Sequence, residues 1–143
     1  MSQPLSKATE LARLLVTHEC SGIFDTAAAA GAVETVCHRL RDHLTDLLGA
    51  GGVTALMGRA LKLAKREHPV LADTTLGADP SVCFAGLAEA LTGGTAEDAV
   101  AAGSAILAHV FHLLIVLLGD ELGVQPVRKL WPDLNSGVME NYE

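Results

Sequence analysis

The sequence predicts an all-α fold: a five- or six-helix bundle around a long, charge-free central helix at about residues 95–122. Half of the 143 residues are hydrophobic but only three Phe, one Trp and one Tyr are aromatic, and 23 Leu and 22 Ala dominate, a composition typical of helices. The 21 residues Ala99–Gly119 contain no Asp, Glu, Lys or Arg. A helix that is apolar all round must be buried on every side.

Apolar residues at spacings of three and four predict the helices of the first half. Asp25 or Thr26 caps the second of them, and Gly31 is a weak point within it. The glycine-rich stretch Gly49–Gly52 reads as a connector between helices, and Pro69 stops the third helix. The predicted helices are 4–18, 26–48 and 53–67.

Turn formers and caps divide the second half. Residues 71–79 read as a loop, and Asp79-Pro80 is a good helix start, with Asp as the cap and Pro in the first turn. Thr95 caps the central helix, which is expected to end at Gly123, and we predict no strand. The remaining predictions are a helix over 80–91, a short helix over 127–130 after Pro126, a single domain over 1–130 and an irregular tail over 131–143 anchored by Trp131.

The charge balance and the cysteines narrow the class of protein. The net charge is −7, which argues against a nucleic-acid partner because such domains carry basic surfaces. Cys20, Cys37 and Cys83 are an odd number without paired spacing, and the N-terminus lacks the layout of a secretory signal. We therefore expect a reduced, bacterial-type cytoplasm and three cysteines that act as small buried hydrophobes.

The apolar run is long enough to cross a bilayer. Acidic pairs flank it at Glu97-Asp98 and Asp120-Glu121, with no Lys or Arg at either edge and no Trp or Tyr belt. These flanks favour a buried central helix over a membrane span. One bulky stripe of this helix is formed by Leu107, Phe111, Leu114 and Leu118, and part of it is a candidate face for a second subunit.

Two histidines interrupt this run. His109 and His112 lie three residues apart on one helix, and neutral imidazoles of this kind bind zinc and haem. The usual two-histidine zinc helix has a spacing of four and a Glu beside the first His, and neither is present. The simpler interpretation is a pair of core histidines.

The other polar clusters read mainly as solvated helix faces. His38 and Asp42 are four residues apart and can pair on such a face. The four cations Arg59, Lys62, Lys65 and Arg66 form the one basic patch, which could dock an acidic partner or a phosphate-bearing ligand. No aromatic residues interleave with the patch, so stacking on nucleic-acid bases is not expected.

The segment His18-Glu-Cys-Ser-Gly22 is similar to the histidine phosphotransfer domains of bacterial two-component signalling, which are helical bundles with an exposed His and a Gly four residues later. The resemblance covers five residues and implies phosphoryl transfer at His18. Ser21 stands where those domains carry a Lys, so the cation that steadies the phosphoryl group is missing. A His that interacts with the dipole of a helix C-terminus explains the position equally.

No arrangement of Ser, Cys or carboxylates indicates a catalytic residue, and no cofactor is expected for the leading function. That function is a non-enzymatic interaction or regulatory module that forms a homo-oligomer and presents charged faces to a protein partner. The alternative is a small-molecule, haem or metal sensor that uses His109 and His112. Phosphotransfer at His18 is a third hypothesis.

Overall fold

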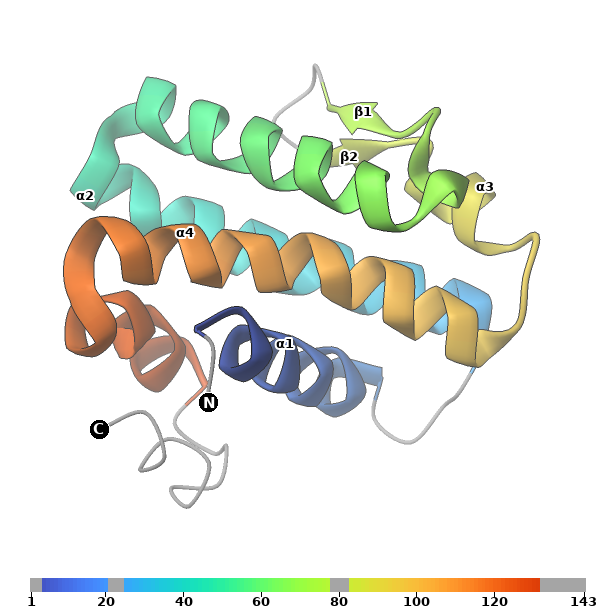
Figure 1. Ribbon diagram of the computed structural model, residues 1–143, viewed down its shortest axis with the longest axis horizontal. Coiled ribbons are helices and arrows are strands. Elements are labelled where there is room, and N and C mark those ends of the chain that lie inside the picture. Colours follow the sequence, from blue (N-terminus) through green and yellow to red (C-terminus); the bar gives the residue numbers. More distant parts are fainter. Residues whose placement is uncertain (1–3, 21–24, 78–82, 132–143) are drawn as a thin grey trace.

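The computed structural model describes residues 4–20, 25–77 and 83–131, and most of these residues are helical (Figure 1). The predicted all-α class is therefore confirmed. The prediction of no strand is wrong for one short antiparallel ribbon, in which Thr75 pairs with Ala85 and Leu76 with Phe84. The elements are α1 (Pro4–Cys20), α2 (Thr26–Glu67), the 3₁₀ turn η1 (Pro69–Leu71), β1 (Thr75–Leu76), β2 (Phe84–Ala85), α3 (Leu87–Leu91) and α4 (Ala96–Leu130).

Helix α2 folds back on itself at one residue. Gly49 has φ 78° and ψ 160°, a backbone conformation that essentially only glycine adopts. The predicted connector is thus in the right place, but its extent is wrong, because Ala50, Gly51 and Gly52 are already helical. We call residues 26–48 the first arm of α2 and residues 50–67 its second arm.

Helix α4 folds back in the same way at Gly119, with φ 89° and ψ 166°. The prediction that this helix ends at Gly123 is wrong. Gly123 lies in the second arm, where a Cβ atom would stand only 2.8 Å from the Cα of Ile115, so its missing side chain serves close packing. Pro126 lies within this arm and does not start a separate helix. The first arm of α4 is 96–118, and the second is 120–130.

The predicted helix over 80–91 is shorter than expected. Phe84 and Ala85 are in β2, and α3 starts only after Gly86, which has the left-handed φ of 82°. The backbone N–H groups of Cys83 and Phe84 donate to the carboxylate of Glu34, so they are not available for a helix start at the predicted place. Residues 78–82, where that start was predicted, lie outside the described residues.

The first arm of α4 packs against α1 and α2, with which α4 makes its most extensive contacts. It runs parallel to the first arm of α2 (Figure 1), and a Cβ at Gly103 would lie 2.6 Å from Cγ2 of Val33. Leu107, Phe111 and Leu114 are fully buried within the chain, and Leu118 is half-buried against the same core. Most of the stripe that we considered as a face for a second subunit is therefore covered by the protein's own helices.

The end of α4 is tied to α1 and α2 through Trp131. The indole N–H donates to Oε2 of Glu19 over 2.8 Å, and the Arg39 guanidinium lies 5.5 Å from the ring centroid. Arg39 Nη1 is also 3.7 Å from the same carboxylate oxygen. The predicted anchor is thus buried in a polar and cation–π contact, while residues 132–143 of the predicted tail lie outside the described residues.

Two helices in the described part of the chain meet the length and hydropathy criteria of a membrane span, α2 and residues 96–119 of α4. The most apolar window of α4 is 72% buried inside the molecule, and that of α2 is 33% buried. A buried core helix meets the same criteria, so length and composition do not separate the two cases.

Candidate functional site

The predicted histidine pair is placed in the core by the first arm of α4. His109 is buried, and its Nε2 lies 3.0 Å from Oε1 of Glu67, at the end of the second arm of α2. The Nδ1 atoms of His109 and His112 are both buried without a hydrogen-bond partner among the described residues. A buried polar atom without a partner is costly, so a ligand or water that bonded to either Nδ1 would be stabilising. A ligand shared by the two remains a prediction.

A small cavity of about 120 Å³ borders His109. It is lined by Thr9 and Arg13 of α1, by Glu67 and His68 at the C-terminal end of α2, and by alanines of α4. Pockets that take drug-sized ligands have volumes of roughly 300–1,000 Å³. This cavity therefore suits a few waters or a small ion better than a haem.

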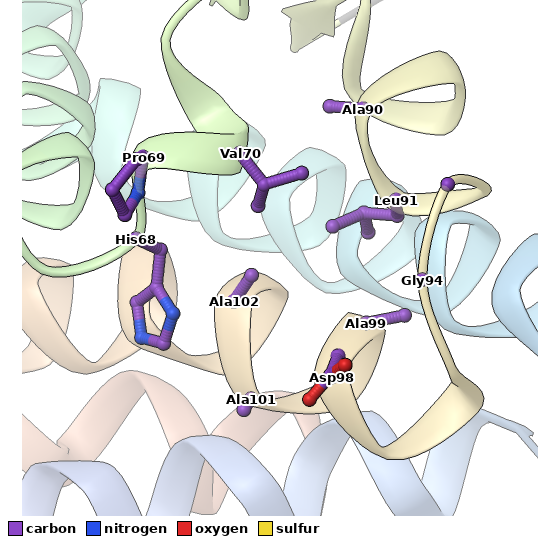
Figure 2. Close-up of a pocket in the computed structure, with 11 residues that line it drawn as sticks. His68, Pro69, Val70, Ala90, Leu91, Gly94, Asp98, Ala99, Ala101 and Ala102 are labelled. Carbon is purple, nitrogen blue, oxygen red and sulfur yellow. The ribbon is translucent and has the colours of Figure 1, made fainter.

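A larger pocket of about 350 Å³ lies between η1, the end of α3 and the start of α4. Figure 2 shows the His68 imidazole and the Asp98 carboxylate on different sides of it, with Val70 and Leu91 among its apolar residues. The sequence did not predict this pocket, because its walls come from three separate segments that only the fold brings together.

The predicted partner-binding cations all lie on the second arm of α2. Arg59, Lys62 and Arg66 are exposed, and Lys65 is half-buried. In the described part of the chain, none of the four forms an ion pair with an acidic side chain. They are therefore available to an external anion or acidic surface.

His18 is exposed in the last turn of α1. The Ser21 and Gly22 positions on which the phosphotransfer resemblance depends lie outside the described residues. The structure thus neither assembles nor excludes that motif.

A further cluster, which sequence reasoning missed, lies where the first arm of α2 meets β2. Glu34, His38 and Cys83 place one ligand-type atom each within 4.8 Å of one another. Glu34 accepts backbone N–H groups with both oxygens, from Cys83 at 2.9 Å and from Phe84 at 2.8 Å. This carboxylate therefore holds the strand, and with it the Cys83 thiol, against α2.

Hydrogen bonds orient His38 within this cluster. Its Nδ1 lies 2.9 Å from Nη2 of Arg41, and its Nε2 lies 3.5 Å from Oε1 of Glu34. A guanidinium can only donate, so Nδ1 accepts and the ring proton of the neutral imidazole is on Nε2, facing Glu34. The predicted partner Asp42 is thus replaced by Glu34 and Arg41.

The second thiol of the cluster belongs to Cys37, which is fully buried. A hydrogen bond with Cys83, followed by burial, raises the pKa of the Cys37 thiol well above its ordinary value. The same hydrogen bond lowers the pKa of Cys83; burial opposes that shift, and the positive charge of Arg41 supports it. The Glu34 and Asp42 carboxylates oppose ionisation of Cys83, but Cys83 is still the more readily ionised of the two thiols.

A signal for half of this cluster exists in the sequence. Glu34, Cys37, His38 and Arg41 follow the spacing 0, 3, 4 and 7, which places them on one helix face. Cys83 is separated from them by more than forty residues and was predicted in a helix, so no local pattern connects the two thiols.

Comparisons with protein-family models, with curated proteins and with solved structures find no match to this chain.

Proposed function

We propose that the chain is a non-enzymatic helical module of the cytoplasm that self-associates, built as a five- or six-helix bundle around the first arm of α4, which has no charged residue after Asp98. The observation that carries the proposal is the distribution of exposed apolar side chains. Of the five large exposed hydrophobic residues in the described ranges, four flank the two glycine turns: Leu47 (61% exposed), Val116 (66%), Leu117 (65%) and Leu122 (51%). We call these four residues the apolar end.

The register of the helices supports this grouping. The first arms of α2 and α4 run parallel, and both turns lie at the same end of the molecule (Figure 1). From the contact between Val33 and Gly103, Leu47 and Leu117 are each 14 residues further along. At about 1.5 Å per residue, both lie roughly 21 Å beyond that contact.

The charges around the apolar end favour a second copy of the chain over a lipid surface. Asp46 and Glu121 are exposed beside it, and residues 42–58 and 112–127 contain no Lys or Arg. Cytoplasmic membrane surfaces are negative and attract basic segments. Two copies can instead cover the same apolar patch on each other across a two-fold axis, while the unpaired cations at 59, 62, 65 and 66 remain free for an acidic protein partner.

Light scattering on a sizing column, without detergent, tests the proposal. We expect the wild type to elute as a discrete dimer or tetramer and Val116→Asp/Leu117→Asp as a monomer. The matched control Ala72→Asp/Ala88→Asp adds the same two charges at exposed positions near η1 and α3, and it should keep the wild-type mass. A monomeric wild type at high concentration, or an unchanged mass in the Val116/Leu117 variant, would contradict the proposal.

The second candidate function is a sensor of a small molecule or metal at His109. The observation that favours it is the partnerless Nδ1 of this buried residue beside the 120 Å³ cavity, with the 350 Å³ pocket sharing His68 as a wall. A metal-containing or coloured preparation would support it. Loss of that signal in His109→Ala or His112→Ala, but not in His43→Ala, would assign the site; no change would exclude it.

A further inference from the structure

We propose that Cys83 and Cys37 form a reversible dithiol–disulfide pair, in which Cys83 reacts first with hydrogen peroxide and Cys37 then closes the disulfide. This is an oxidation site inside the module and is independent of whether the chain self-associates. Three features carry it: the adjacent thiols, the cationic side chain beside them and a small cavity that reaches one of them.

The cavity gives access to Cys83. Its volume is about 70 Å³, and Arg41, Thr54 and Met57 line it together with Cys83. A water molecule occupies roughly 30 Å³ of liquid volume, and hydrogen peroxide is only one oxygen atom larger. The cavity therefore has room for hydrogen peroxide beside Cys83.

The electrostatics assign different roles to the two sulfurs. The thiolate is the nucleophilic form of cysteine, and the positive charge of Arg41 together with the Cys37 hydrogen bond favours this form at Cys83. Cys37 is fully buried, and its Sγ lies 3.6 Å from Sδ of Met57. Burial shields Cys37 from the oxidant, and its hydrogen bond with Cys83 places it next to the sulfur that reacts first.

The reaction balances with hydrogen peroxide as the only oxidant. The Cys83 thiolate attacks one peroxide oxygen, the O–O bond breaks, and the leaving hydroxide takes up a proton to give water and Cys83 sulfenic acid. The Cys37 sulfur then attacks the Cys83 sulfur. The S–O bond breaks, the S–S bond forms, and the Cys37 proton leaves with the hydroxide as a second water. Two thiols lose two electrons, and one peroxide becomes two waters.

The same residues are poorly arranged for a metal ion. Both oxygens of Glu34 already accept backbone N–H groups, and the free lone pair of His38 at Nδ1 accepts from Arg41. A divalent cation bound to His38 would have to displace Arg41 from Nδ1 or the proton from Nε2, and it would sit beside a guanidinium of like charge. The hydrogen bonds therefore favour the thiol pair over the metal site that the ligand types alone would suggest.

Mass spectrometry of the full-length protein tests the proposal. The reduced chain is treated with equimolar hydrogen peroxide, and its intact mass is measured before alkylation and digestion. We expect the intact mass to fall by two hydrogens. We also expect a crosslinked peptide that joins Cys37 to Cys83, and recovery of both thiols after treatment with dithiothreitol. The control Cys20→Ser removes the third buried thiol, which lies in α1, and should form the same crosslink at the same rate.

Two variants separate the steps. Cys37→Ser should stop the reaction at a Cys83 sulfenic acid that dimedone traps, and Cys37→Ala provides the same test with an apolar replacement. Arg41→Gln should slow oxidation of Cys83, because it removes a positive charge that lowers the pKa of this thiol.

Three results would overturn the proposal. One is a wild-type protein whose Cys37 and Cys83 stay reduced. Another is oxidation that starts at Cys20. The third is stoichiometric binding of Zn²⁺ that is lost in Cys83→Ser and blocks the crosslink, since this would assign the cluster to a metal.

Discussion

The two long helices of this protein both fold back at a glycine, but the arms close differently. Gly49 in α2 and Gly119 in α4 have nearly the same backbone angles, and a Cβ at either would meet nothing within 4 Å. In α4 the arms meet at the backbone, where Gly123 packs on Ile115. In α2 they meet through side chains, where Cys37 Sγ lies 3.6 Å from Met57 Sδ.

This difference shows what the glycines near each turn do. The sequence around Gly49 contains two more glycines within three residues, whereas the next glycine after Gly119 is four residues away. Each turn needs only one residue in the glycine-only region of backbone space. A second glycine lets the arms approach in both helices: a Cβ at Gly52 would lie 3.2 Å from Cβ of Leu48, and one at Gly123 would lie 2.8 Å from the Cα of Ile115. The glycine-rich stretch predicted the turn of α2, whereas the single Gly119 did not predict the turn of α4.

The largest loss of stability is expected where the two arms of α4 touch. In Gly123→Ala the new methyl group would lie 2.8 Å from Cα and 3.0 Å from N of Ile115. Backbone cannot rotate away as a side chain can, so the arms must separate. We expect the free energy of unfolding, measured in urea, to fall by about 3 kcal/mol or more. A loss below about 1 kcal/mol would show that the arms are not in backbone contact.

The next largest loss of stability is expected at the contact between the first arms of α2 and α4. In Gly103→Ala the methyl group would lie 2.6 Å from Cγ2 of Val33, a side chain that is fully buried. We expect a loss of about 2 kcal/mol. Because the obstacle is a side chain, Val33→Ala should recover part of the loss when combined with Gly103→Ala, as a double-mutant cycle would measure. If the losses of the two single variants added up exactly in the double variant, the two residues would not be in contact.

Substitution of either turn glycine is expected to destabilise the protein less, and by the same amount in both helices. Gly49→Ala and Gly119→Ala each force a Cβ into a backbone region that glycine alone populates, with no steric contact. We expect each to cost about 1–2 kcal/mol in the same urea titration. A cost at one position only would mean that the two turns are not equivalent.

A helical glycine of α2 gives the smallest effect, with the opposite sign. A Cβ at Gly31 also meets nothing within 4 Å, but this residue is in regular helix of the first arm. Gly31→Ala should raise the free energy of unfolding by about 0.5–1 kcal/mol, because alanine loses less backbone entropy. Gly31→Ala and Gly49→Ala together compare two positions of α2 at which a Cβ has free space but the backbone conformation differs. If Gly31→Ala destabilised the protein, Gly31 would not be in regular helix.

Sequence patterns predicted much of the helical content and only part of the candidate sites. Spacings of three and four located the helices before residue 67, and the cap at Thr95 is confirmed by its hydrogen bond from the Asp98 N–H. The pocket between η1, α3 and α4 could not be predicted, since its walls are distant in the chain. The contact of His109 with Glu67 joins two helices and has no local signature either.

The sequence by itself determined that residues 99–118 are helical and mostly buried, because a helix without charges or a polar face has no stable place in water. It also determined that Glu34, Cys37, His38 and Arg41 share a helix face, since helical periodicity is local. Only the tertiary structure decided that Cys83 meets Cys37. That contact depends on the Glu34 carboxylate holding two backbone N–H groups from a strand about fifty residues away, and such long-range hydrogen bonds leave no trace in local spacing.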